Sequence, residues 1–303
     1  MSRDIFVIVN PAAGGGRASH YKATISEYFT SRRRSVEFSE SNSSEDVRKQ
    51  AARAAADGYT YVLALGGDGT FHHLVEGIRG TDAIAGFLPA GGGNDIARAL
   101  DIPADPVRAT NAFLHSVPRA IDLIRARFAN GRIAYCVGAA GMGLDAEAAY
   151  LACTRFSRWP GAIRYVAGAL WTYFRGAAFD LHAEIDGVEW NGRALFAVAA
   201  NAGEYGSGVR IAPAATMEDG WLELVLVRDL PWMRLIEAIP IVLTSGDLRF
   251  AEVERFRCRR VLLEANRSAR VHGDGELLGE SPAEFEILPR ALRVMAPKRR
   301  EAQ

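Results

Sequence analysis

Three glycine-rich segments in the first hundred residues carry the residue types that bind nucleotide phosphates. They are VNPAAGGGRA (residues 9–18), LALGGDGTFHH (residues 63–73) and LPAGGGNDIARAL (residues 88–100). Glycines let backbone N–H groups approach an anion closely, and a helix that starts there adds the positive end of its dipole. The segments therefore predict a site for a phosphorylated ligand.

The second segment has the most specific pattern. Gly67 and Gly69 flank Asp68, which leaves its carboxylate clear to bind a Mg²⁺ ion that bridges phosphate oxygens. A plain Asp-Gly turn with Thr70 as the cap of the next helix is the structural alternative, but it does not explain the preceding glycine pair. In the first segment Arg17 would contact phosphate oxygens, although a flexible turn explains its glycines equally well.

The third segment places Asn94 and Asp95 at a predicted helix start. Asp95 alone could be only a helix cap, but the match with the other two segments favours a nucleotide-lining role. The P-loop pattern GxxxxGK[ST] does not occur in the chain. GMGLDA (residues 141–146) matches a dinucleotide fingerprint, but no acid follows about 20 residues later to bind ribose, so we do not expect NAD there.

The apolar spacing places the three segments at the ends of strands. Short buried runs at Ile5–Val9, Tyr61–Leu65 and Ile84–Leu88 alternate with amphipathic stretches. This alternation is typical of a parallel sheet with helices on both faces, in which ligands bind at the carboxyl ends of the strands. The remaining elements expected here are helices over Ala18–Thr30 and Ser43–Asp57, the latter capped by Ser43, and a short strand over Val36–Ser39.

From about residue 126 the pattern becomes that of a mainly antiparallel, β-rich domain. Asp186-Gly187 and Asn191-Gly192 are hairpin-type dipeptides between apolar runs. The strands expected are Phe196–Ala200, Leu222–Val227, Val261–Glu264, Phe285–Leu288 and Leu292–Met295, and the helices are Ala162–Arg175 and Pro231–Leu243. The predicted fold class is α/β + β: a doubly wound nucleotide domain over residues 1–125 and a β-rich domain over residues 126–289. The last segment, residues 290–303, is a candidate to return to the first domain.

Composition and charge argue against several classes of protein. Lys+Arg and Asp+Glu total 36 each, so no excess of positive charge suggests a nucleic-acid partner. Cys136, Cys153 and Cys258 lie far apart, which argues against a zinc site or a disulfide framework. The N-terminus lacks signal-peptide features, and the apolar stretch at residues 161–174 is too short to span a bilayer. We therefore expect a cytoplasmic protein that is soluble or peripheral at the inner face of the membrane.

The full set of motifs, in this order, resembles the diacylglycerol-kinase catalytic family, which includes bacterial lipid kinases, sphingosine kinases and ceramide kinases. The three glycine-rich segments match its first three motifs. In the second half, AANAGEYGSGVRIAPAATMEDGWLEL (residues 199–224) and HGDGE (residues 272–276) match its later ones. GGDGT alone would also fit NAD kinases and phosphofructokinases. The resemblance implies a two-domain kinase that transfers the γ-phosphate of ATP to a lipid hydroxyl, with ATP between the domains.

The resemblance also implies roles for individual residues of the nucleotide site. Asp68, Asp95 and Asp122 correspond to acids that organise Mg²⁺ and water. The residues expected to line the nucleotide are Asn10, Gly14, Gly15, Gly16, Arg17, Ser41, Gly66, Gly67, Asp68, Gly69, Thr70, Gly91, Gly92, Asn94 and Asp95.

Further roles are implied for the second domain. Glu276 matches the family's proton acceptor, and Asp274 would support it. In some bacterial members a structural metal is held by an acid and two backbone carbonyls, which correspond here to Asp219, Thr216 and Trp221. As a simple hairpin turn, HGDGE would carry only solvated acids.

The chain departs from the family pattern at three positions. His72 and His73 stand where the family commonly has Asn-Glu, and Gly92 where it often has Thr or Ser. We interpret these differences as changes in how an active enzyme organises its nucleotide or metal. Two other functions stay open: a kinase of a soluble substrate such as NAD, and a regulatory nucleotide-binding protein without turnover.

The stretch from Arg155 to Arg175 combines four arginines with several aromatic residues, including Trp159, Tyr165 and Trp171. Such a helix suits a membrane interface, where it would collect a lipid substrate, but a core helix with arginines on its rim explains the pattern as well. The identity of the lipid and the oligomeric state, including a homodimer, stay open.

Overall fold

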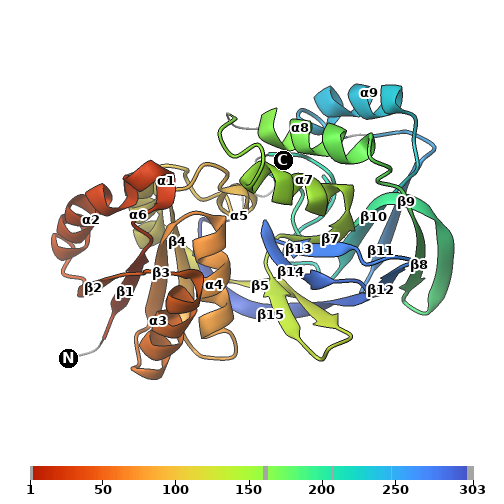
Figure 1. The fold of residues 1–303 in the computed structure, drawn as a ribbon. Helices are drawn as coiled ribbons and strands as arrows, with labels where there is room; N and C mark the ends of the chain where they lie inside the picture. Colours follow the sequence, from red (N-terminus) through yellow and green to blue (C-terminus); the bar gives the residue numbers. More distant parts are fainter. Residues whose placement is uncertain (1–2, 160–162, 207, 247, 299–303) are drawn as a thin grey trace. The chain divides into compact units, whose positions relative to one another are not determined.

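The structure is a computed structural model that describes residues 3–159, 163–206, 208–246 and 248–298. It divides into two compact units (Figure 1). The first unit comprises Met1–Ile121 and Arg290–Gln303, and the second comprises Asp122–Pro289. The boundary expected from the sequence, at residue 125, lies near the observed division at residue 121.

The first unit is built on a parallel sheet in the order β2-β1-β3-β4. Its strands are β1 (Ile5–Val9), β2 (Val36–Glu40), β3 (Tyr61–Gly66) and β4 (Ile84–Pro89). Ile5 pairs with both Val36 and Tyr61, so these strands start in register and end at one edge. The C-terminal part of β15 (Ala283–Ala296) joins the sheet beside β4, with Val294 opposite Ala85 in a parallel pair.

Helices flank this sheet on both faces, as a doubly wound fold requires (Figure 1). They are α1 (Ala13–Gly16), α2 (Tyr21–Thr30), α3 (Ser44–Ala56), α4 (Asp68–Ile78), α5 (Asp95–Ala99) and α6 (Pro106–His115), with a 3₁₀ turn at Ala18–His20. The hydroxyl of Ser43 accepts the N–H of Asp46 at 3.1 Å and caps α3, as the sequence predicts. The structural alternative in which Thr70 caps the next helix is wrong, because α4 begins at Asp68 with Gly67 as its N-cap.

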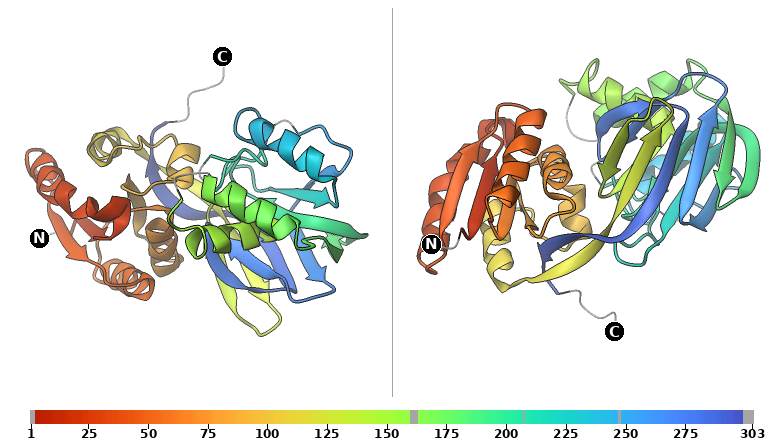
Figure 2. Two further views of the ribbon diagram at one scale, coloured as in Figure 1. Left: turned by 45° about the horizontal axis from the view of Figure 1, so that its top comes forward. Right: turned by 90° about the horizontal axis from the view of Figure 1, so that it is seen from below.

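The second unit is a mainly antiparallel β structure (Figure 2), and buried apolar side chains of its strands form a large core. Its strands are the C-terminal part of β5 (Val117–Phe128), β6 (Ile133–Cys136), β7 (Ala139–Gly143), β8 (Phe179–Ile185), β9 (Val188–Ala200), β10 (Leu222–Arg228), β11 (Val253–Cys258), β12 (Arg260–Ala265), β13 (Arg270–Gly273), β14 (Glu276–Glu280) and the N-terminal part of β15. Cys136 and Cys258 are free thiols within it, and the side chain of Cys153 lies outside the described part.

Three helices accompany these strands: α7 (Leu144–Cys153), α8 (Ile163–Tyr173) and α9 (Trp232–Val242). The first residue of the helix predicted over Ala162–Arg175 lies outside the described residues. No helix within the described ranges is long and apolar enough to cross a membrane.

Two sequence-based expectations about the β-rich part are wrong. Asn191-Gly192 is no hairpin turn, because both residues lie inside β9, paired with His182 and Leu181 of β8. The turn between these strands is formed by Asp186-Gly187 alone, next to the pair Ile185–Val188. The two strands expected at Phe285–Leu288 and Leu292–Met295 belong to one long strand, β15, in which Arg290 between them has a left-handed φ of +53°.

Candidate active site

The three glycine-rich segments of the first unit meet at one edge of its sheet. They follow β1, β3 and β4 directly, and backbone hydrogen bonds join them beyond the strand ends. The N–H of Asn10 donates to the carbonyl of Leu65 at 3.0 Å, and that of Ala90 donates to Gly66 at 2.6 Å. The segments that the sequence analysis grouped by motif are therefore neighbours in space.

Two glycines show why these loops tolerate no larger residue. Gly14 has φ +62°, and a Cβ built there would lie 2.4 Å from the carbonyl oxygen of Ala90. A Cβ on Gly91 would lie 2.7 Å from the Cα of Gly67. Both distances are shorter than any real carbon contact, so glycine is required for the backbones to pass this closely.

Polar side chains lock the same loops together. Asn10 donates from Nδ2 to the Thr70 hydroxyl at 3.0 Å, and its Oδ1 accepts the N–H of Ala12 at 3.1 Å. The buried hydroxyl of Ser41 donates to the carbonyl of Val9 at 3.1 Å. Asn10, Ser41 and Thr70 thus shape the end of β1.

Asp68 connects the second segment to the third. Its two carboxylate oxygens accept the N–H groups of Asp95 (3.0 Å) and Ile96 (3.1 Å), the first two residues of α5. A carboxylate at the start of a helix satisfies donors that have no partner within the helix. The structure therefore brings Asp68 and Asp95 together, as expected, and gives Asp68 a structural task that the sequence analysis did not foresee.

Positive charge and an unused acceptor lie beside these loops. Arg98 pairs with Asp95 and donates to the carbonyl of Gly93 at 2.5 Å, and Arg17 donates to that of Gly14 at 2.9 Å. Asn94 donates to the carbonyl of Gly91 at 2.9 Å, and its buried Oδ1 has no hydrogen-bond partner among the described residues. The sequence analysis missed Arg98, for which the spacing of three from Asp95 on a helix was the available signal.

These features fit an anionic nucleotide. A Cβ on Gly15, Gly16 or Gly92 would meet nothing within 4 Å among the described atoms, so these backbones border open space. Glycine backbone, two guanidinium groups and an unsatisfied amide oxygen are the groups that phosphates and a nucleoside require.

In the second unit, the acidic motif at residues 272–276 is held by a carboxylate. Asp274 has φ +52° and accepts three backbone N–H groups: those of Val137 (2.7 Å), Gly138 (2.7 Å) and Ala139 (3.3 Å). These are charge-assisted hydrogen bonds to a partly buried side chain. They fix the turn that leads into Glu276, the first residue of β14.

Glu276 differs from its neighbour in having no fixed partner. Among the residues that the structure describes, its carboxylate makes no hydrogen bond or ion pair, and the residue is half-buried. A carboxylate that is positioned by the backbone but unengaged can accept a proton. The structure is thus consistent with the roles expected for Asp274 and Glu276, which stay predictions.

A hydrogen-bonded group of three residues includes His272 of this motif and was not foreseen from the sequence. His272 Nε2 lies 2.6 Å from Asp145 Oδ2, and the Tyr205 hydroxyl donates to the same oxygen at 3.1 Å. The rings of Tyr205 and His272 stack with centroids 5.8 Å apart. Two atoms of the triad, His272 Nδ1 and Asp145 Oδ1, are buried without a partner in the described part of the chain.

Asp122 lies in the second unit, where its side chain is 0% exposed and accepts the N–H of Gly220 at 2.7 Å. Its carbonyl accepts from Asn201 Nδ2 at 2.9 Å, and the same nitrogen donates to Val137 at 2.7 Å. The structure thus connects Asp122 with the Asp219-Gly220 turn. Asn201 was quoted in the sequence motif but not singled out, because its partners lie far away in the chain.

The expected structural-metal residues lie in that turn. Asp219 accepts the N–H of Trp221 at 3.0 Å and pairs with Arg257 at 3.1 Å. The guanidinium groups of Arg257 and Arg259 lie 5.0 and 4.6 Å from the Trp221 ring centroid. A cation at Asp219 would compete with the guanidinium of Arg257 for this carboxylate. The metal role of Thr216, Asp219 and Trp221 stays a prediction.

Comparisons with known proteins agree with this arrangement. The model of the diacylglycerol kinase catalytic domain matches residues 4–126, and that of the YegS C-terminal NAD kinase beta sandwich-like domain matches residues 138–296. A diacylglycerol kinase of Mycobacterium tuberculosis (strain ATCC 25618 / H37Rv) is 29% identical over 301 residues, which cover 97% of this chain and 95% of that protein. A diacylglycerol kinase of Bacillus subtilis (strain 168) is 24% identical over 307 residues, 98% and 97% of the two chains.

A crystal structure of a diacylglycerol kinase from Bacillus anthracis str. Sterne has the same fold, with a TM-score of 0.76 at 18% identity over 98% of this chain and 97% of that one. A parallel α/β unit with phosphate-type loops, followed by an antiparallel β unit, defines the class of NAD kinase-like and diacylglycerol kinase-like phosphotransferases. Within that class, the chain belongs to the diacylglycerol kinase catalytic domain family, with a YegS-type C-terminal domain. This family uses ATP.

Proposed function

We propose that this chain is an ATP- and Mg²⁺-dependent lipid kinase that phosphorylates the hydroxyl group of a diacylglycerol-like or sphingoid lipid. Lipid-kinase relatives that align over almost the whole chain support the class of reaction. The observation that carries the proposal is the turn at residues 272–276, where Asp274 is bound by three backbone N–H groups and Glu276 is left unengaged.

The nucleotide is assigned to the loops of the first unit. The glycine backbones of residues 14–16 and 91–92 bind the phosphates, and Arg17 and Arg98 neutralise their charge. Asn94 Oδ1, which has no partner among the described residues, accepts a hydrogen bond from the nucleoside. Asp68 and Asp95 would hold Mg²⁺ through acceptor positions that remain beside their contacts with α5 and Arg98, and the ion would supply charge neutralisation at the phosphate oxygens.

The chemical step is assigned to Glu276. Its carboxylate accepts the proton of the lipid hydroxyl while that oxygen forms a bond to the γ-phosphorus and the bond between this phosphorus and the bridging oxygen of ADP breaks. The products are a lipid phosphate, ADP and a protonated Glu276, which releases its proton to solvent. A positioned carboxylate of this kind contributes about 10²–10⁴-fold to the rate.

Exposed apolar side chains on the second unit support lipid presentation at a membrane surface. Trp232 and Ile236 of α9 and its C-cap residue Leu243 follow helical spacing along one face and are about half exposed. Near α8, Phe174 is 69% exposed, and the guanidinium groups of Arg155 and Arg175 lie 4.2 and 4.5 Å from the centroid of the Trp171 ring. Arginine beside exposed aromatic rings suits an anionic bilayer interface.

The test is transfer of labelled phosphate from ATP to dispersed lipids, with and without Mg²⁺, using the full chain. The panel includes diacylglycerol, a sphingoid base, ceramide, phosphatidylglycerol and, as a soluble acceptor, NAD. We expect a labelled lipid in the presence of Mg²⁺. Labelling of NAD alone would replace the proposal by a soluble-substrate kinase, and ATP binding without transfer to any acceptor would favour a regulatory protein.

Binding to the membrane is tested separately by flotation with vesicles that contain anionic lipid. The variant Trp232→Glu/Ile236→Glu is expected to float less than the wild type, because charge replaces apolar contact. A matched control is Glu237→Gln, on the same helix. Failure of the wild type to float at low salt would contradict the membrane part of the proposal and leave the kinase part intact.

A further inference from the structure

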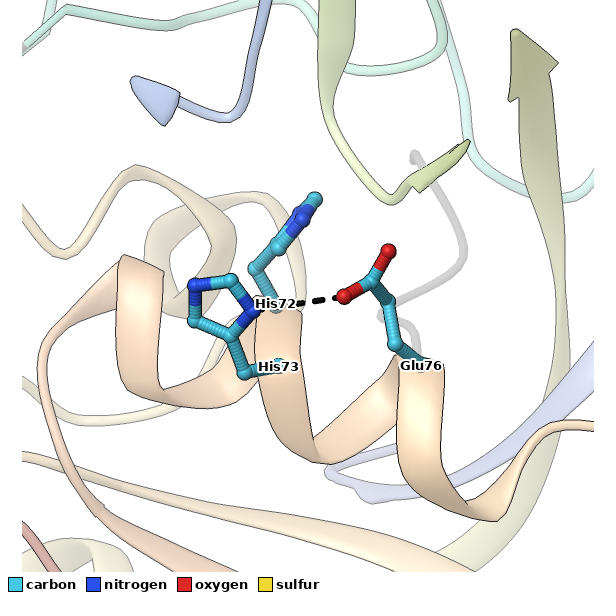
Figure 3. Close-up of side chains that lie close together, drawn as sticks. All are labelled: His72, His73 and Glu76. Atoms are coloured by element: carbon cyan, nitrogen blue, oxygen red, sulfur yellow. Dashed lines mark hydrogen bonds and ion pairs between the residues drawn. The ribbon is translucent and has the colours of Figure 1, made fainter. Parts of the chain in front are cut away.

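Three potential metal ligands cluster on α4, in the first unit. His72, His73 and Glu76 each offer one ligand atom, and these atoms all lie within 4.8 Å of one another. Figure 3 shows the carboxylate of Glu76 turned back toward the imidazole rings. His72 is 1% exposed, and His73 and Glu76 are half-buried. The cluster includes both histidines at which the chain departs from the sequence pattern it otherwise matches.

The geometry of two of these groups already resembles that of a metal site. His73 Nδ1 lies 3.3 Å from Glu76 Oε2, which is long for a hydrogen bond between charged partners, about 2.7–2.9 Å. Two atoms bound to one tetrahedral zinc ion, with bonds of about 2.0–2.1 Å, lie about 3.4 Å apart. An ion could therefore enter between these atoms with little movement of either side chain.

His72 supplies the third ligand from the same side. It precedes Glu76 by four residues on the helix, a spacing that places two side chains next to each other. Its ring lies edge-on to that of His73, with centroids 4.9 Å apart. The ligand atoms of the cluster lie within 4.8 Å of one another, whereas two ligands of one zinc ion lie about 3.4 Å apart. A rotation of the His72 side chain that shortens the longest of these distances by about 1.4 Å would therefore give the spacing of bound ligands.

One further observation describes the state of the second histidine. His73 Nε2 is buried and has no hydrogen-bond partner among the described residues, so hydrogen bonding alone does not satisfy this ring.

We propose that His72, His73 and Glu76 bind one divalent transition-metal ion, such as Zn²⁺ or Co²⁺, at a site separate from the Mg²⁺ that accompanies ATP. Imidazole nitrogens favour transition metals, whereas Mg²⁺ takes oxygen ligands. The three ligands leave a fourth position for water or another ligand. Because α4 begins at Asp68, the ion would cross-link the first turns of the helix that carries the nucleotide loop.

The test is titration of the full chain with Co²⁺ in the presence of excess Mg²⁺, followed by the visible ligand-field absorption of the bound ion and by competition with Zn²⁺. The variants are His73→Asn and Glu76→Gln, whose side chains are partly exposed, and the buried His72→Asn. The control is His115→Asn, which removes an exposed histidine from α6 of the same unit. Thermal unfolding of each protein verifies that it is folded.

We expect the wild type and the control to bind one ion per chain and to gain thermal stability from Zn²⁺. We expect His73→Asn and Glu76→Gln to bind at least tenfold more weakly. Absence of Co²⁺ binding by the wild type, displacement of Co²⁺ by Mg²⁺, or equal binding by folded His73→Asn would overturn the proposal. The readout does not involve phosphate transfer, so the result is independent of the proposed kinase activity.

Discussion

The loops of the first unit and the acidic turn of the second unit hold their groups in different ways. In the first, glycine backbones pass within van der Waals distance of one another, and side chains such as Asn10 and Asp68 connect neighbouring loops. In the second, one carboxylate, Asp274, binds backbone N–H groups more than 130 residues away in the chain. The loops proposed to bind phosphates are made from closely packed backbone, whereas the carboxylate proposed as the base, that of Glu276, is positioned by its neighbour Asp274.

The largest effect is expected at Glu276. Glu276→Gln keeps the size of the side chain but removes its capacity to accept a proton, so kcat for phosphate transfer should fall by about 10²–10⁴-fold with little change in the Kd for ATP. Glu280→Gln, in the same strand, is the matched control. Undiminished transfer by folded Glu276→Gln would show that another group is the base.

A smaller effect is expected where two loops of the first unit touch. Gly91→Ala would place a methyl group 2.7 Å from the Cα of Gly67, and the free energy of unfolding should fall by about 1–3 kcal/mol, with weaker ATP binding. Gly92→Ala meets nothing within 4 Å among the described atoms and should keep its stability. Equal Tm values for the two variants would contradict the close approach seen in the structure.

The smallest effect is expected at Asp219. Its ion pair with Arg257 is largely exposed, so Asp219→Asn should change the free energy of unfolding by at most about 1 kcal/mol. Thermal unfolding with and without added Mg²⁺ or Ca²⁺ measures this. A metal-dependent Tm that disappears in Asp219→Asn would instead support the structural metal that the sequence resemblance implies.

The site residues that could be predicted from the sequence are those whose motif is continuous in the chain. The three glycine-rich segments were recognised because glycine, acid and strand end stand next to each other in the chain. Arg98 was missed although its partner Asp95 stands three residues before it on the same helix, and Asn201 was missed because its partners are set by the folded backbone. The pair His272–Asp145 joins residues 127 positions apart, for which a single sequence gives no signal.

The two errors in the β-rich part have different causes. Asn191-Gly192 has the composition of a hairpin turn, but the ladder between β8 and β9 extends past it because seven consecutive pairs hold the strands together. The two runs expected as separate strands form one strand, β15, whose first part pairs with β12 and whose last part pairs with β4.

The most direct test of the account is a double-mutant cycle of Glu276→Gln and Asp274→Asn, with the rate of phosphate transfer to the phosphorylated lipid as the readout. Because Asp274 acts only by positioning Glu276, the account predicts that each variant alone is slower than the wild type and that the double variant is no slower than Glu276→Gln. If the double variant is folded and its rate falls by the product of the two single-variant factors, Asp274 acts independently of Glu276. That result would contradict the assignment of this turn.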